Sequence, residues 1–171
     1  MAHPQIAIFA RLANGNAETA RRIEGNKTLL GRTQHSIRHN SIHDELIVTN
    51  PWAGAVLTFP GDAVGETPPI RIIRGPKTGL SELEQMQVYP PRGWVLVTQT
   101  SDSSFQEPKD TFVGVWSIRD HGDVPPRWKI GGGKSTIKKP RGIALNPKNK
   151  EVIVADMRLN AVLTFYFPEL F

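Results

Sequence analysis

The chain has 171 residues, with 21 Lys and Arg against 16 Asp and Glu and a formal net charge of +5. Hydrophobic residues make up 39% of it, which supplies a core for about one domain and excludes a disordered polymer. It contains no cysteine, and no run approaches the roughly 20 apolar residues of a membrane span, so disulfides, thiolate chemistry and a membrane location are not expected.

The elements predicted along the chain are short β-strands, because runs of β-branched and aromatic residues alternate with Gly, Pro, Asn and Asp. Two strand-like runs come first, at about 5–10 and 19–24. A set of four follows, at about 35–39, 45–49, 55–59 and 69–74. Two further sets repeat this arrangement, the last without its fourth strand. We therefore expect repeat units at about 5–34 (partial), 35–80, 84–137 and 140–171.

An internal repeat relates these units. The pentapeptide Ala-Val-Leu-Thr-Phe occurs at 55–59 and again at 161–165, and the aligned 23-residue segments that end there share ten identical positions. A second alignment, at an offset of 50 residues, has nine identities in 23 positions. The repeated hydrophobic residues, Ile37 and Phe59 among them, are expected to form the core.

Four short strands in each period of roughly 40–50 residues predict the blades of a β-propeller. One four-stranded sheet cannot bury both of its faces, whereas sheets stacked around an axis bury face against face. The expected fold is all-β, with about three four-stranded antiparallel blades plus one extra strand. That amounts to roughly half of a six-bladed ring.

One stretch also resembles a known repeat family. It reads Pro-Arg-Gly-Ile-Ala-Leu-Asn-Pro at 140–147, Glu-Val-Ile-Val-Ala-Asp at 151–156 and Asn-Ala-Val-Leu-Thr-Phe at 160–165, and it resembles an NHL repeat. The resemblance implies a β-propeller, a fold that hosts both binding proteins and enzymes. The two earlier repeats lack the Pro-x-Gly turn of that pattern.

A half ring would leave strand edges unpaired, and unpaired edges attract further strands. One interpretation is a head-to-tail homodimer, in which residues 19–24 of one chain complete the blade formed by 141–165 of the other. The alternative is a piece of a longer propeller. The sequence leaves both interpretations open.

The predicted binding surface is a mildly basic face formed by the loops between blades and the loops between second and third strands. The latter loops differ most between repeats, and loops on a rigid scaffold commonly carry function. The residues predicted to bind a ligand there are Trp52, Lys134, Lys138, Lys139, Arg141 and Arg158. Trp52 is the leading candidate, as an aromatic side chain beside a turn.

Two motifs suggest chemistry but fit a structural role better. Residues 131–136 read Gly-Gly-Gly-Lys-Ser-Thr, yet Trp128 occupies the position where a phosphate-binding loop requires glycine. His35, His39 and His43 are four residues apart, but along extended chain they would spread over more than ~20 Å and could not share one metal.

The predicted function is therefore a non-catalytic scaffold that binds a protein or another macromolecule, a second copy included. No cofactor and no resident metal are expected, and the location expected by default is the cytoplasm, because residues 1–5 show no secretory signal.

Two alternatives remain open. A metal-dependent propeller hydrolase or lactonase would use Glu45 or Glu151 with Asn50 or Asp156, because some lactonases that resemble this fold bind a divalent ion through such side chains. An RNA-binding propeller would use the basic face, since phosphate groups favour clustered Lys and Arg.

Overall fold

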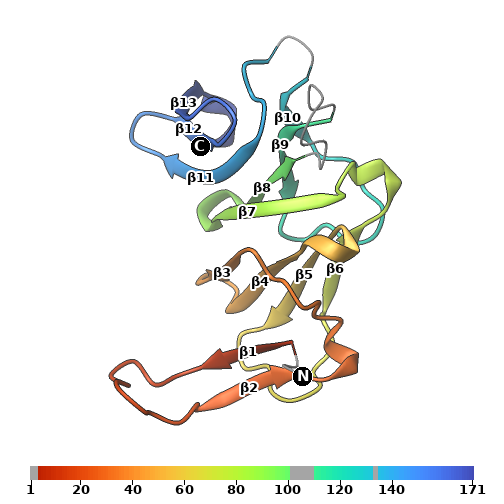
Figure 1. Ribbon diagram of the computed structural model, residues 1–171, viewed down its shortest axis with the longest axis vertical. Coiled ribbons are helices and arrows are strands. Elements are labelled where there is room, and N and C mark those ends of the chain that lie inside the picture. The colour runs from red at the N-terminus through yellow and green to blue at the C-terminus, as the bar shows by residue number, and fades with distance from the viewer. Residues whose placement is uncertain (1–3, 101–109, 133–134) are drawn as a thin grey trace.

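The computed structural model describes residues 4–100, 110–132 and 135–171. These residues form four antiparallel β-sheets, which follow one another in chain order along the long axis of the molecule (Figure 1). Short loops and single turns of 3-10 helix join the strands. The predicted all-β fold with propeller-like blades is confirmed. Within the described ranges, no helix is long and apolar enough to cross a membrane.

The first sheet is a two-stranded ribbon, the second and third sheets have four strands each, and the last has three. Strands that are consecutive in a sheet pair as antiparallel neighbours. The strands are β1 (Gln5–Ile8), β2 (Arg21–Glu24), β3 (Ile37–Asn40), β4 (Glu45–Asn50), β5 (Ala55–Pro60), β6 (Arg71–Arg74), β7 (Glu82–Tyr89), β8 (Trp94–Thr100), β9 (Phe112–Ser117), β10 (Trp128–Gly131), β11 (Pro140–Asn146), β12 (Glu151–Asp156) and β13 (Ala161–Tyr166). The 3-10 turns are η1 (Asn26–Thr28), η2 (Pro51–Ala53), η3 (Pro76–Thr78), η4 (Pro90–Arg92) and η5 (Pro168–Leu170).

The first strand of each of the last three sheets lies on the same side of the molecule. In Figure 1 these strands, β3, β7 and β11, line up along the left side, and the later strands of the second and third sheets extend away from them. We call β3, β7 and β11 the inner strands. Because they are neighbours in space, side chains from three successive repeats can meet along this side.

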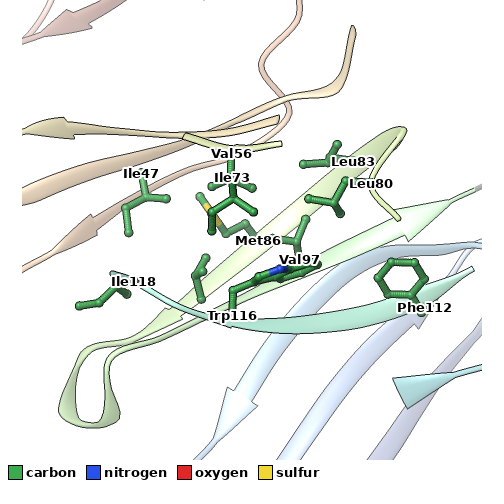
Figure 2. Close-up of a cluster of buried hydrophobic side chains, with 11 residues drawn as sticks. Ile47, Val56, Ile73, Leu80, Leu83, Met86, Val97, Phe112, Trp116 and Ile118 are labelled. Atoms are coloured by element: carbon green, nitrogen blue, oxygen red, sulfur yellow. The ribbon is translucent and has the colours of Figure 1, made fainter. Parts of the chain in front are cut away.

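The core lies between the sheets. Alternate residues of each strand point to opposite faces, so β4 sends Ile47 toward the third sheet and Val48 toward the ribbon. The cluster between the second and third sheets packs around Trp116 and Met86, which are fully buried (Figure 2). Similar clusters join the ribbon to the second sheet and the third sheet to the last. Face-to-face burial between successive sheets therefore holds the described structure together.

Backbone contacts also link successive sheets. Ile23 of β2 forms a parallel bridge with Gly65, and Ile73 of β6 forms the equivalent bridge with Gly122. Beside each bridge a carboxylate from the next sheet accepts a backbone N–H of the turn after the outer strand: Glu66 after β2, at 3.0 Å, and Asp123 after β6, at 2.8 Å. These glycine-containing turns are structural joints. The predicted counterpart at 131–136 lies partly outside the described residues.

The expectation that Ile37 belongs to the core is wrong. Ile37 on β3 is exposed, whereas its repeat equivalent on β11, Ile143, is buried. The difference arises because a four-stranded sheet precedes β11 and covers it with β7 and β8. Only the two-stranded ribbon precedes β3, and it contributes no inner strand to cover Ile37.

Candidate functional site

Two of the three inner strands, β7 and β11, carry an irregularity at the same position of the repeat. Pairing between β7 and β8 shifts register between Leu83 and Met86, and pairing between β11 and β12 shifts between Pro140 and Gly142. A β-bulge of this kind turns a side chain away from the alternation of its strand, and bulges often occur beside active sites. The residue redirected in β11 is Arg141.

Buried threonines on the second strands hold this irregular backbone. The Oγ1 of Thr98 accepts the backbone N–H of Gln85 at 2.9 Å, and the Oγ1 of Thr49 accepts that of Ser36 at the same distance. Both threonines are fully buried. The hydroxyls satisfy donors that the strand ladder leaves unpaired, and they fix the backbone next to Glu84 and next to His35.

Three side chains from equivalent positions of three repeats meet near the start of the inner strands. One carboxylate oxygen of Glu84, Oε2, lies 2.9 Å from His35 Nδ1, and the other, Oε1, lies 2.7 Å from Arg141 Nη1. We call His35, Glu84 and Arg141 the inner-strand cluster. The side chain of Glu84 is 10% exposed, those of His35 and Arg141 31% and 44%. A buried carboxylate thus presents two partly exposed, positively chargeable groups to solvent.

The contacts of His35 define its tautomer. Nδ1 faces two acceptors, the Glu84 carboxylate and the backbone carbonyl oxygen of Leu83 at 3.2 Å. Nδ1 therefore carries the hydrogen, and in the neutral ring the lone pair is on Nε2. Among the described residues Nε2 has no hydrogen-bond partner. His35 can accordingly accept a proton at Nε2, while Glu84 stabilises the imidazolium that forms.

A second layer of hydrogen bonds holds the inner strands together below the cluster. Gln87 of β7 accepts from Arg38 Nε of β3 at 3.2 Å and donates to the carbonyl oxygen of Ile143 in β11 at 3.1 Å. Gln85 donates to the carbonyl oxygen of His35 at 2.9 Å. A connected network of hydrogen bonds between the inner strands therefore supports the cluster.

Two hollows border the cluster, and His35 lines both. The first, of about 330 Å³, also contains Arg38. The second, of about 390 Å³, is lined by Thr33, His35, Pro51, Trp52, Ser81 and Glu82, and we call it the Trp52 hollow. Its volume is in the range of small-molecule sites.

The structure separates the residues predicted to bind a ligand. Arg141 belongs to the inner-strand cluster, and Trp52 lines the hollow beside it. The backbone N–H groups of Lys138, Lys139 and Arg158 donate to the Asp156 carboxylate, so these three residues belong to loops organised around Asp156. Lys134 lies outside the described residues.

The side chains predicted for a metal-dependent alternative have structural contacts. Glu45 pairs with Arg71 at 2.5 Å, and Glu151 accepts from Asn146 at 2.8 Å within its own hairpin. Asp156 accepts four backbone N–H groups, at 2.7 to 3.1 Å. Over the residues the structure describes, no group of three or more His, Asp or Glu side chains is arranged to hold a metal ion. His35 and His39 pair with different carboxylates, Glu84 and Asp44.

Glu84 is a residue of the cluster that the sequence analysis did not identify. A signal was present: offsets of 49 and 57 residues place His35, Glu84 and Arg141 in one column of the repeat. A column of polar, chargeable residues at the start of three inner strands marks the side on which the blades converge. Extending the alignment to the second complete repeat would have identified the cluster.

Comparisons with known proteins support the fold. No protein-family model and no curated protein matches the chain. Solved structures that resemble it include a provisionally assigned 6-phosphogluconolactonase from Bacteroides fragilis, with a TM-score of 0.55 and 17% identity over 78% of this chain and 34% of that one. Another, from Bacteroides uniformis, has a TM-score of 0.55 and 13% identity over 78% of this chain and 36% of that one.

These neighbours and the four sheets define the class: an all-β protein of the β-propeller type. The chain spans about a third of the length of the two solved structures. At this level of identity, the likeness concerns the fold alone.

Proposed function

We propose that the inner-strand cluster is the base and anion-binding part of a hydrolase site that opens lactones of anionic sugar acids. The observation that carries the proposal is the geometry of His35, whose Nδ1 is held by Glu84 and whose Nε2 is left to accept a proton. Arg141 beside it supplies a partly exposed positive charge. The provisional assignment of two similar folds as 6-phosphogluconolactonases supports the choice of a lactone.

The proposed reaction uses these groups in sequence. A water molecule attacks the lactone carbonyl carbon while His35 Nε2 takes a proton from it, and the Glu84 carboxylate stabilises the resulting imidazolium. The bond between the carbonyl carbon and the ring oxygen then breaks, and the leaving alkoxide takes the proton back from Nε2. Arg141 binds the negative group of the substrate through N–H groups that Glu84 does not occupy. The products are the open hydroxy acid and the regenerated site.

Hydrolysis of 6-phosphogluconolactone by the full chain tests the proposal, with the spontaneous rate subtracted. We expect His35→Gln to lower the catalysed rate by about 10²–10⁴-fold, the usual contribution of a positioned base. His39→Gln is the matched control, because His39 lies on β3, four residues after His35, and also pairs with a carboxylate, Asp44, at 2.9 Å. Equal rates for wild type and His35→Gln would refute the proposal. A rate abolished by a chelator and restored by a divalent ion would favour the metal-dependent version.

A second proposal concerns assembly. The pentapeptide Ala-Val-Leu-Thr-Phe is buried along β5 but largely exposed in β13: Val56 is 1% exposed and its copy Val162 69%. β13 is also an edge strand, with its outer side unpaired among the described strands. The same residues that form a core in one sheet thus form a surface in another. This supports the association of two copies through their end sheets, as expected for paired half rings.

Two finer assignments also remain proposals. An NHL type of blade is supported by the sequence pattern at 140–165 alone. Macromolecule binding through the loop face, by a protein or by RNA, is supported by the loop residues Trp52, Lys138, Lys139 and Arg158. Binding of RNA would weaken steeply as salt is raised, whereas the hydrolase proposal makes no such demand.

A further inference from the structure

Trp52 is unusual among the exposed side chains because it is held in place. Its side chain belongs to η2, and the residue is 83% exposed. The indole Nε1–H nevertheless donates to Thr33 Oγ1 at 3.1 Å, which ties the ring to the segment that leads into the inner strand β3. Pro51 restricts the backbone of the turn beneath it, which ends at Gly54 with a φ of 56°. A flat aromatic face is therefore presented to solvent at little entropic cost on binding.

The rest of the Trp52 hollow has the chemistry that recognises hydroxyl groups. Thr33 and Ser81 supply hydroxyls, and Glu82 supplies a carboxylate. Ser81 Oγ accepts from Gln99 Nε2 at 2.8 Å, so its own hydrogen is available to donate. A hollow lined by the Trp52 ring and by the polar side chains of Thr33, Ser81 and Glu82 suits a ligand that has an apolar face and several hydroxyl groups.

We propose that the Trp52 hollow binds the ring of a sugar acid, with the C–H face of the ring on the indole and its hydroxyls toward Thr33, Ser81 and Glu82. The role of this ring as substrate rests on the hydrolase function proposed above, because His35 lines the same hollow. Arg141 belongs to the same cluster as His35 and carries a partly exposed positive charge. The negative end of the ligand therefore points toward Arg141, and Trp52 selects sugars over other anionic lactones.

Nuclear magnetic resonance of the full chain tests this binding without any turnover. The chain has four tryptophans, so the indole N–H spectrum is simple, and Trp52→Phe assigns the Trp52 signal. On titration with 6-phosphogluconate we expect a saturable shift of that signal and no shift for Trp116, which is fully buried in the core. An unmoved Trp52 signal at saturating ligand would overturn the proposal.

Variants separate the sugar site from the hydrolase proposal. We expect Trp52→Ala to weaken 6-phosphogluconate binding by about tenfold or more, and Trp52→Phe to retain most of it, because phenylalanine keeps an aromatic face. Tyr166→Ala, at another exposed aromatic residue, is the control and should bind as wild type does. Undiminished binding by Trp52→Ala would overturn the sugar site.

His35→Gln distinguishes the two proposals, since it should lose hydrolysis while it keeps the ligand-induced shift of Trp52. If that variant hydrolyses the lactone normally and Trp52 still shifts, the hydrolase mechanism fails and the sugar site stands.

Discussion

Replacing Glu84 by glutamine removes the charge at the centre of the inner-strand cluster and keeps the volume of the side chain. The carboxylate makes two charge-assisted contacts, at 2.9 Å to His35 and 2.7 Å to Arg141, and its side chain is buried. A hydrogen bond to a charged group contributes about 1.5–3 kcal/mol. Both partners are partly exposed and can regain water, and glutamine keeps one acceptor. We therefore expect Glu84→Gln to lower the free energy of unfolding by about 1.5–2.5 kcal/mol.

Urea unfolding followed by tryptophan fluorescence measures this loss. For a urea dependence of about 1–3 kcal/mol per molar, the midpoint should fall by about 1 M with an unchanged slope. The matched control is Asp44→Asn, because Asp44 also pairs with a histidine, His39, at the same distance of 2.9 Å. Unlike Glu84, both side chains of this pair are largely exposed. That control should cost about 0.5 kcal/mol or less. A loss for Glu84→Gln no larger than the loss for Asp44→Asn would refute the assignment of the cluster as a buried, coupled unit.

Two further predictions follow from the sheets themselves. Thr98→Val should cost about 1–3 kcal/mol in urea unfolding, because the Gln85 backbone N–H loses its acceptor, the fully buried hydroxyl of Thr98. Thr164→Val, at an exposed strand position, should change stability by less than about 0.5 kcal/mol. Equal effects of the two substitutions would contradict the role of Thr98 in the bulge. Light scattering should give a mass near twice 19.0 kDa for the wild type and near 19.0 kDa for Val162→Lys. Ile42→Lys, at another exposed residue, is the control and should leave the mass unchanged. A monomeric wild type would refute the paired assembly.

The sequence by itself determined the strands and their grouping into blades. Runs of β-branched and aromatic residues broken by Gly, Pro, Asn and Asp act locally, and an identical pentapeptide at two places predicts two equivalent strands. The third strands β5 and β13 contain that pentapeptide. The repetition of the glycine-containing turns at 25–28 and 75–78 likewise indicates a structural role and not a phosphate site.

Only the tertiary structure decided what the repeated positions do. One copy of the pentapeptide is buried and the other exposed, depending on which sheet lies beside each. The residues of the strand itself do not specify which sheet that is. The inner-strand cluster depends on bulges that buried threonines of neighbouring strands stabilise, and a bulge reverses the face to which a side chain points. His35, Glu84 and Arg141 come from three different repeats, and stacking of the sheets brings them within hydrogen-bonding distance. Strand alternation along the chain specifies a face, whereas packing between sheets specifies which faces meet.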